Sequence, residues 1–399
     1  MKKFVAQSLL LISALTGKAQ WQQMTTMPSD ARVIPNIFVI GTNAYIGGGF
    51  KQGYIYLNDL WEYNTTNDTW TQKANIPASI GGAAAFTLNA KGYIACGWLN
   101  GANNAGVYEY DPALNMWTTK NNFTGAARYA SCIFVLNNKA YMGLGYSPLR
   151  DDLWEYDAAT DTWTQKANFI GGAREGTVHF ALNGLGYVGL GLNNTSTYAG
   201  NNDFYTYDAN NNAWSQIANF PGPARHSSVS FVINGKAYIT TGNTGNASGI
   251  TYDDLWEFNA GSLVPWTQLT SLPAGARQSG GAFAVGNCGY VFGGFYQSPV
   301  PGFFNDLWRW CSTTGVDENA AEDNVNIIVY CNSLQLNIDA QKYLKASCVF
   351  EMYAVDGKKV LSQHIISNQT LIPTKNFAKG IYAWKFFAGD NVKSGKVVF

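Results

Sequence analysis

The sequence predicts an all-β protein in which a closed ring of six four-stranded sheets is followed by a small β-sandwich. The main observation is a tryptophan that recurs at intervals of 46 to 52 residues: Trp21, Trp70, Trp117, Trp163, Trp214 and Trp266. Periods of this size are typical of propeller blades or solenoid units. Each repeat also contains four short apolar or alternating runs separated by Gly, Asn, Asp and Pro, which favours a four-stranded antiparallel meander.

Other positions of the repeat are equally regular, and we name its four strands a to d. An arginine follows the tryptophan by eleven residues in five copies, with Gly81 in the second copy: Arg32, Arg128, Arg174, Arg225 and Arg277. A glycine follows strand b in every copy: Gly49, Gly97, Gly145, Gly191, Gly242 and Gly294. Strand c has an aromatic residue in every copy: Trp61, Tyr108, Trp154, Tyr205, Trp256 and Trp308.

This pattern resembles the kelch repeat, which has an arginine before strand a, glycines after strand b, and spaced Tyr and Trp on strands c and d. The full double glycine of that motif is present as Gly48-Gly49 and Gly293-Gly294. The resemblance implies a six-bladed kelch β-propeller of the galactose oxidase type. We assign residues 20–311 to this domain.

The N-terminal strand is expected to close the ring. The first d strand, at residues 21–24, precedes any a–b–c set, and the last c strand, at 306–310, has no d strand after it. An open ring would leave two unpaired strand edges, and pairing the first strand with the last blade removes them. Trp21 is therefore predicted to belong to blade six.

Residues 1–19 are predicted to be a secretory signal peptide. Lys2 and Lys3 precede an apolar run at 9–15, and small residues precede the expected cleavage before Gln20. No later run of eighteen apolar residues occurs, so we expect no transmembrane segment. We expect the protein to be secreted or attached to the outer cell surface.

The charge balance argues against a nucleic-acid partner. Lys+Arg and Asp+Glu are equal at 26 each, and charged residues make up 13% of the chain. A protein with this balance has no global field that would attract nucleic acid or an anionic membrane. The 42 glycines and 15% aromatic residues fit many short strands joined by tight turns.

The loops between strands b and c are the predicted binding surface. The distance from the glycine after strand b to the aromatic residue of strand c varies from 9 to 14 residues, whereas the other spacings are nearly constant. In a meander the b–c and d–a loops lie on one face, which we call the b–c face, and we expect it to bind a glycan or protein ligand. The d-strand tryptophans are expected to be core residues.

The five arginines permit two interpretations. A ring of guanidinium groups around a channel mouth could bind carboxylates or sulfates. The alternative is an ion pair within each blade, because the same repeats have an aspartate just before the strand c aromatic: Asp59, Asp152, Asp203, Asp254 and Asp306. The second repeat has Gly106 at this position and also lacks the arginine, which favours the structural interpretation.

Glu175 and His226 are low-ranking catalytic candidates. They follow the arginine in adjacent blades and form the one acid–base combination at that position, where they could exchange protons with a sugar. The alternative is that both are solvated loop residues. The sequence resembles a sialic acid mutarotase of six-bladed kelch architecture only at the level of fold, and fold alone does not supply function.

Metal and cofactor chemistry are not predicted. The three histidines, His179, His226 and His364, lie in different blades or domains without ligand spacing. Copper oxidases of the same superfamily need two histidines and tyrosines at one site. The sequence also has no nucleophile elbow, phosphate loop or metalloprotease motif.

The C-terminal part is predicted to be a separate domain. Residues 312–323 are small and acidic and indicate a linker, and residues 324–399 show alternating strands that suggest a small β-sandwich. The segment VFEMYAVDGKKV and residues 377–382 resemble the C-terminal sorting domain of the type IX secretion pathway. This resemblance implies an interaction with the type IX secretion machinery and passage across the outer membrane.

The six cysteines suggest disulfides in an exported chain. Cys288 begins strand b of blade six and Cys311 ends strand c, so antiparallel pairing should bring them within bridging distance. Cys331 and Cys348 form a second possible pair. Cys96 and Cys132 lie in different blades and are expected to remain buried thiols.

Two function classes follow from the sequence. The favoured one is a secreted or surface-displayed binding module that recognises a glycan or a protein through its b–c face. The alternative is a carbohydrate-active enzyme of the sialic acid epimerase or mutarotase type.

Overall fold

The computed structural model describes residues 21–312 except 100, 194–198, 246–248 and 297–301. In the C-terminal part it describes residues 328–331, 335–339, 348–354, 358–365, 369–373, 377–378, 381–388 and 391–398. The chain divides into two compact units, with Lys18–Ser312 in one and Thr313–Phe399 in the other. Every regular element that the described residues form is a β-strand.

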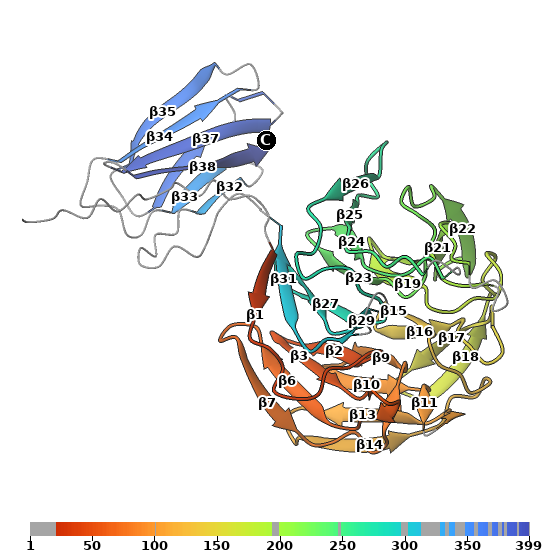
Figure 1. Ribbon diagram of the computed structural model, residues 1–399. Helices are drawn as coiled ribbons and strands as arrows, with labels where there is room; N and C mark the ends of the chain where they lie inside the picture. The colour runs from red at the N-terminus through yellow and green to blue at the C-terminus, as the bar shows by residue number, and fades with distance from the viewer. Residues whose placement is uncertain are drawn as a thin grey trace, which may run out of the picture. The chain divides into compact units, whose positions relative to one another are not determined.

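The first unit is a six-bladed β-propeller, which confirms the predicted fold (Figure 1). Each blade is a four-stranded antiparallel sheet with strand order a–b–c–d. Blade 1 contains β2 (Asn36–Ile40), β3 (Asn43–Gly47), β6 (Leu60–Asn64) and β7 (Thr69–Lys73). Blade 2 contains β9 (Ala84–Leu88), β10 (Lys91–Ala95), β13 (Val107–Asp111) and β14 (Met116–Lys120). Blade 3 contains β15 (Cys132–Leu136), β16 (Lys139–Gly143), β17 (Leu153–Asp157) and β18 (Thr162–Lys166).

The remaining blades repeat this arrangement. Blade 4 contains β19 (Val178–Leu182), β20 (Leu185–Gly189), β21 (Phe204–Asp208) and β22 (Ala213–Ile217). Blade 5 contains β23 (Val229–Ile233), β24 (Lys236–Thr240), β25 (Leu255–Phe258) and β26 (Trp266–Leu269). Blade 6 contains β27 (Gly281–Val285), β28 (Cys288–Phe292), β31 (Leu307–Cys311) and β1 (Trp21–Met24).

The N-terminal strand closes the ring as predicted. β1 pairs antiparallel with β31, and Trp21 lies opposite Trp310. On the other side of β31, Cys288 of β28 lies opposite Cys311 and forms a disulfide with it, with their Cα atoms 4.1 Å apart. The last blade is therefore held both by the strand from the N-terminus and by a covalent cross-link between strands b and c.

Aromatic pairs fill the layers between blades. A phenylalanine of strand a stacks on the tyrosine of strand b in every blade, with ring centroids 4.7 to 5.6 Å apart: Phe38–Tyr45, Phe86–Tyr93, Phe134–Tyr141, Phe180–Tyr187, Phe231–Tyr238 and Phe283–Tyr290. The next blade must leave space for these rings. At Gly92, an added Cβ would lie 2.1 Å from Phe38, so glycine is required for this close approach.

The d-strand tryptophans differ in how deeply they are buried. Trp21, Trp163, Trp214 and Trp266 are 7 to 9% exposed, as expected for core residues. Trp70 and Trp117 are only partly buried, and their indole N–H groups donate to the backbone oxygens of Thr25 and Ala74. Both rings still pack against a core cluster, so these two copies lie at the margin of the core.

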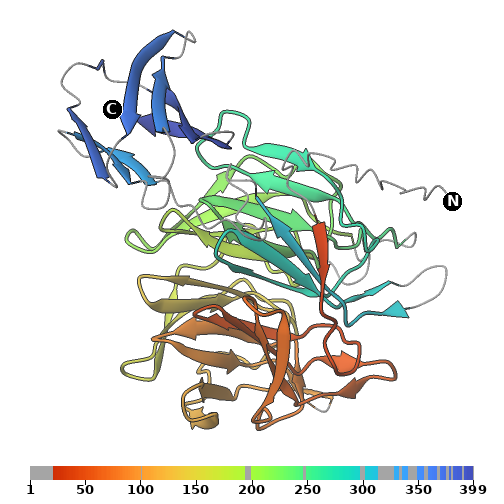
Figure 2. The same cartoon turned by 90° about the vertical axis from the view of Figure 1, so that its left-hand side faces the viewer.

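Additional short strands lie in the b–c loops and, in the case of β8, in the connection before strand a of blade 2. They are β4 (Phe50–Lys51) with β5 (Ile55–Tyr56), β8 (Ile80–Gly81) with β11 (Trp98–Leu99) and β12 (Ala102–Asn103), and β29 (Phe295–Tyr296) with β30 (Gly302–Phe303). Figure 2 shows β29 and β30, drawn in cyan, projecting from one face of the ring. This face is the b–c face.

The second unit contains two antiparallel sheets. One consists of β32 (Ile328–Cys331), β33 (Gln335–Asp339) and β36 (Gln369–Pro373). The other consists of β35 (Lys359–Ile365), β34 (Cys348–Tyr353), β37 (Ile381–Ala388) and β38 (Asn391–Val398). Phe350 and Trp384 are buried and stack with ring centroids 5.8 Å apart. The small β-sandwich is thus confirmed.

Three predictions lie outside the described residues. They are the signal peptide at 1–19, the linker at 312–323 apart from its first residue Ser312, and the side chains of Cys331 and Cys348. Cys96 and Cys132 are buried free thiols, and burial raises the pKa of each to about 12. Among the described residues, no helix is long and apolar enough to span a membrane.

Candidate functional site

Two sets of residues around the propeller axis form the b–c face. The inner set follows the arginine position of each blade and extends strand a. The outer set follows the glycine after strand b. The six pairs, each joined by β-bridges, are Val33 with Phe50, Gly81 with Trp98, Tyr129 with Tyr146, Glu175 with Leu192, His226 with Asn243, and Gln278 with Phe295.

The five repeat arginines lie behind this face and are neutralised within the protein. Each is 0 or 1% exposed and makes a two-point ion pair with the aspartate that precedes strand c of its own blade. The pairs are Arg32–Asp59, Arg174–Asp203, Arg225–Asp254 and Arg277–Asp306, each with a shortest contact of 2.6 Å, and Arg128–Asp152. The arginine therefore connects strand a with strand c of the same blade.

The aspartates of these pairs receive further hydrogen bonds. The indole N–H of the strand c tryptophan donates to the carboxylate at 2.8 to 2.9 Å in four blades: Trp61, Trp154, Trp256 and Trp308. Burial by itself would raise the pKa of Asp59, but hydrogen bonds and positive charge from Arg32 hold it below its ordinary value. Arg128 and Trp154 have the same effect on Asp152. The carboxylates of Asp59 and Asp152 are therefore ionised at neutral pH.

In blade 2 the arginine position is occupied by a different residue from the one predicted. The N–H of the glycine after strand b donates to the backbone oxygen of the arginine in the next blade, and in blade 1 the acceptor of Gly49 is Ile80. Ile80, not Gly81, therefore occupies the arginine position, and it is fully buried. The connection before strand a is one residue shorter in this blade, so the arginine position follows Trp70 by one residue fewer than in the other blades. Gly106 occupies the aspartate position as predicted, because its carbonyl accepts from Cys96 as the aspartate carbonyls do in other blades.

A closed ring of six backbone hydrogen bonds surrounds the channel mouth. The residue two positions after each arginine donates its N–H to the equivalent carbonyl of the preceding blade, at 2.7 to 3.4 Å. In order, Ile34 donates to Ser279, Ser279 to Ser227, Ser227 to Gly176, Gly176 to Ala130, Ala130 to Gly82, and Gly82 to Ile34. All six residues have positive φ, between 45° and 62°. The left-handed conformation turns both polar groups into the ring.

Aromatic side chains occupy the b–c face over four consecutive blades. We call the following eight residues the aromatic arc: Phe295 and Phe303 of blade 6, Phe50, Tyr54 and Tyr56 of blade 1, Trp98 of blade 2, and Tyr129 and Tyr146 of blade 3. Neighbouring rings are in contact, with centroids 5.0 to 6.4 Å apart. The Tyr56 and Trp98 side chains interact directly and join the two halves of the arc. None of the eight is fully buried, and Tyr54 is 78% exposed.

Blades 4 and 5 place Glu175 and His226 beside the aromatic arc. An added Cβ on Gly176 would lie 3.7 Å from the Cβ of His226, so the histidine lies against the residue that follows Glu175. Burial raises the pKa of Glu175 to about 7. Burial also lowers the pKa of His226, whose Nδ1 shares a hydrogen bond of 2.9 Å with Ser227 Oγ. The structure thus brings the two acid–base candidates to adjacent positions of one face.

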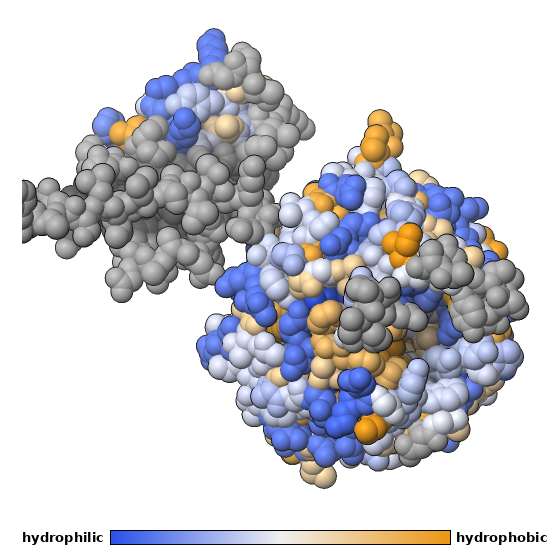
Figure 3. Space-filling model, viewed as in Figure 1, coloured by the Kyte–Doolittle hydropathy of each residue, from blue (hydrophilic) through white to orange (hydrophobic). Residues whose placement is uncertain are grey.

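Figure 3 looks onto the b–c face. Apolar residues gather near its centre, and hydrophilic residues surround them. A sequence pattern that was not part of the prediction indicates this surface. The outer position is the first residue of every b–c loop, and it is aromatic in four consecutive blades, at Phe295, Phe50, Trp98 and Tyr146. Only the closed ring shows that these four residues are neighbours.

Comparison with known proteins agrees with this architecture. Residues 331–399 match the secretion system C-terminal sorting domain. An N-acetylneuraminate epimerase of Haemophilus influenzae (strain PittEE) is 34% identical over 113 residues, which are 27% of this chain and 30% of that protein. Kelch-like protein 23 of Pongo abelii is 26% identical over 298 residues, which are 73% of this chain and 43% of that protein.

The first unit is a β-propeller that is similar to kelch-repeat proteins, and residues 331–399 match a secretion sorting domain. An N-acetylneuraminate epimerase of Shigella sonnei (strain Ss046) is also similar, with 31% identity over 120 residues. The matched regions span between about a third and less than half of these relatives' lengths. The sorting domain indicates export by the type IX system, so the protein is secreted or attached to the outer cell surface.

Proposed function

We propose that this secreted kelch propeller binds a carbohydrate through its b–c face. The observation behind the proposal is the aromatic arc, in which eight partly exposed aromatic residues from four blades lie next to one another on the face with the variable loops. Tyr and Trp combine a large apolar surface with a polar group, which suits a ligand with both C–H faces and hydroxyl groups. Pyranose rings have this chemistry.

The electrostatics of the face favour a neutral or weakly charged sugar surface. The guanidinium groups that could have held several carboxylates or sulfates are each paired with an aspartate at their own blade. Lys51, near the aromatic arc, is also paired, with its Nζ 3.1 Å from Asp30. Affinity from this surface would therefore come mainly from stacking and neutral hydrogen bonds.

A glycan array with the exported protein tests the proposal. Trp98→Ala and Tyr54→Ala should each weaken binding to the selected glycan about tenfold, because truncation of a central aromatic contact commonly costs more than 1 kcal/mol. Leu263→Ala is the matched control, since Leu263 is fully exposed and belongs to a c–d loop on the other face. Binding that survives both aromatic substitutions would contradict the proposal. An array without binders, together with a protein partner lost in Trp98→Ala, would assign the face to a protein ligand.

Sugar epimerase or mutarotase activity is the second candidate, because Glu175 has a pKa near neutrality and lies in the blade next to His226. A general acid or base works best when its pKa is close to the working pH. Three-tenths of the chain resembles proteins named N-acetylneuraminate epimerase, so N-acetylneuraminate is the first substrate to test. Proton NMR would follow conversion between its anomers and epimers.

Glu175→Gln separates binding from catalysis. If the protein is an enzyme of this type, the amide should abolish turnover while binding is retained, because it preserves shape but cannot transfer a proton at neutral pH. Absence of turnover by the unmodified protein would remove this candidate and leave the binding function.

A further inference from the structure

The propeller channel contains a chamber of about 310 Å³ next to the ring of backbone hydrogen bonds. Strands a of all six blades line it, at the third and fifth positions after the arginine column. The lining is polar on blades 3 to 5, with Ser131, Thr177, His179, Ser228 and Ser230. Blades 6, 1 and 2 face them with Gly280, Ala282, Pro35, Ile37, Ala83 and Ala85. Of the residues that the structure describes, none with a charged side chain lines the chamber.

Three of the polar side chains have buried atoms without a partner in the protein. They are Ser131 Oγ, Thr177 Oγ1 and His179 Nδ1. Ser131 and Thr177 are 8 and 6% exposed. The two remaining serines are bonded, since Ser228 Oγ donates to Thr241 O at 2.9 Å and Ser230 Oγ donates to His179 O at 3.0 Å. Buried polar groups without partners are rare in native proteins, so three around one chamber indicate that its contents supply the missing bonds.

We propose that this chamber binds a small, uncharged, hydroxyl-rich molecule of about monosaccharide size. The hydroxyls of Ser131 and Thr177 can each donate and accept, as can the hydroxyls of a polyol. The apolar half of the wall matches the C–H surface of such a molecule. A volume near 310 Å³ is at the lower end of the range for ligand pockets. This site is separate from the b–c face and does not depend on the function proposed there.

The state of His179 fits a neutral ligand. Burial lowers its pKa to about 4 and outweighs the opposing effect of a hydrogen bond with the Thr177 backbone, so the imidazole is uncharged at neutral pH. Ser131 and Ser228 occupy the positions equivalent to Thr177 in the neighbouring blades. A carboxylate or ammonium group in the chamber would find no opposite charge and would lose its hydration.

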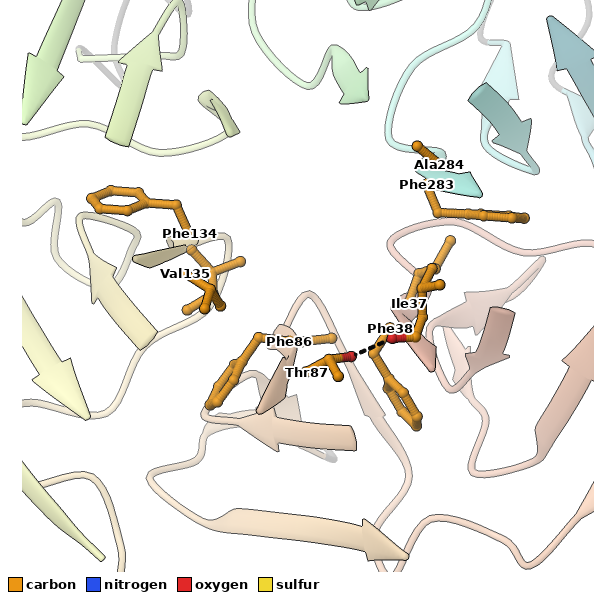
Figure 4. Close-up of a pocket in the computed structure, with 11 residues that line it drawn as sticks. Ile37, Phe38, Phe86, Thr87, Phe134, Val135, Phe283 and Ala284 are labelled. Carbon is orange, nitrogen blue, oxygen red and sulfur yellow. Dashed lines mark hydrogen bonds between the residues drawn. The ribbon is translucent and has the colours of Figure 1, made fainter. Parts of the chain in front are cut away.

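A second cavity continues the chamber along the axis and helps to fix the depth of the ligand. It has a volume of about 360 Å³ and shares Ile37, Ala85 and Ile133 with the chamber. Figure 4 shows this cavity, with the rings of its phenylalanines directed into the blades. Its one hydroxyl, on Thr87, already donates to Val39 O at 2.7 Å. Unsatisfied hydrogen-bonding groups are therefore found in the chamber and not in this extension.

Histidine-labelled protein and simple sugars provide the test. The chain has three histidines, so the imidazole ¹⁵N signals of His179 can be assigned with a His179→Asn variant. D-galactose, D-glucose and myo-inositol are the neutral probes, and D-glucuronate is the charged probe. We expect at least one neutral probe to shift the His179 signals saturably, and we expect glucuronate to bind at least about tenfold more weakly.

Two substitutions locate the binding. Thr177→Val and Ser131→Ala each remove one hydroxyl and should weaken the neutral probe about three- to tenfold. Thr240→Val is the matched control, because Thr240 also has a buried unpartnered hydroxyl but does not line the chamber. It should leave the affinity unchanged. Trp98→Ala should also leave it unchanged, which separates this site from the b–c face. If Thr177→Val does not fold, Ser131→Ala gives the same test.

Two results would overturn the proposal. The first is the absence of a saturable His179 shift with every neutral probe at concentrations of tens of millimolar, which would mean that the chamber holds water only. The second is binding that is insensitive to Thr177→Val and Ser131→Ala but lost in Trp98→Ala, which would place the sugar on the b–c face alone.

Discussion

Arg225→Ala is expected to lower the free energy of unfolding of the propeller by about 3 to 5 kcal/mol, the usual cost of removing one partner from a buried ion pair. The substitution removes both bonds to Asp254, at 2.6 and 2.8 Å, and those to the backbone oxygens of Thr241 and Pro223. It also removes the stacking of the guanidinium over Tyr252, at 3.9 Å. Asp254, whose side chain is 12% exposed, is then left with the Trp256 indole as its remaining side-chain donor.

Urea unfolding followed by tryptophan fluorescence measures this loss in the propeller, because twelve of the 13 tryptophans precede residue 312. Blade 2 supplies the control, since it has Ile80 and Gly106 in place of the ion pair. Arg225→Ile combined with Asp254→Gly copies that blade and leaves no unpaired charge. It should therefore be more stable than Arg225→Ala by about 1 kcal/mol or more. A loss below about 1 kcal/mol for Arg225→Ala, or equal losses for both variants, would refute the reasoning.

Three further predictions concern Glu175, the disulfide and the core tryptophans. Because burial raises the pKa of Glu175 to about 7, this carboxyl group binds a proton more tightly in the folded chain than in the unfolded chain. Its contribution should therefore lower the free energy of unfolding by about 3 kcal/mol as the pH rises from about 4.5 to 7. Thermal unfolding at pH 5 and pH 8 should show a smaller pH effect in Glu175→Gln, and identical pH profiles would argue against the shift. Replacing both Cys288 and Cys311 by serine should cost about 3 kcal/mol in urea unfolding, because the bridge closes a loop with a sequence separation of 23; no loss would mean that the bridge adds nothing. Trp163→Ala should lower the free energy of unfolding by about 3 to 5 kcal/mol in the same urea experiment. Trp70→Ala should lower it less, because Trp70 is only partly buried, and equal losses for the two variants would contradict this reasoning.

The fold could be predicted from the sequence because each blade has its own copy of the same local signals. The repeated tryptophan and glycine positions can be recognised without knowledge of any tertiary contact, and they located all six blades and the closing strand. Alignment by counting was wrong only where a connection changed length. Blade 2 lost one residue before strand a, so Gly81 was assigned to a position that Ile80 occupies.

The candidate sites could not be predicted in the same way, because their residues come together only when the ring closes. Ser131, Thr177 and Ser228 are equivalent positions of three blades, and nothing in one repeat shows that all three face a shared chamber. The aromatic arc likewise joins Phe303 to Phe50, which are close in space because the last blade lies beside the first. Contacts of this kind depend on the number of blades and not on the pattern within one blade.

The ring of backbone hydrogen bonds at the channel mouth forms although several of its residues must adopt an unfavourable backbone conformation. Four of its six residues, Ile34, Ala130, Ser227 and Ser279, are not glycine and still have positive φ. That conformation costs roughly 1 to 2 kcal/mol for an L-residue and is unusual for a β-branched residue such as Ile34. The cost is borne because each of these residues both donates to one neighbouring blade and accepts from the other. These hydrogen bonds therefore fix the six blades relative to one another next to the aromatic arc, Glu175 and the polar chamber. The backbone is the same in each blade at this position, whereas the side chains that it carries differ.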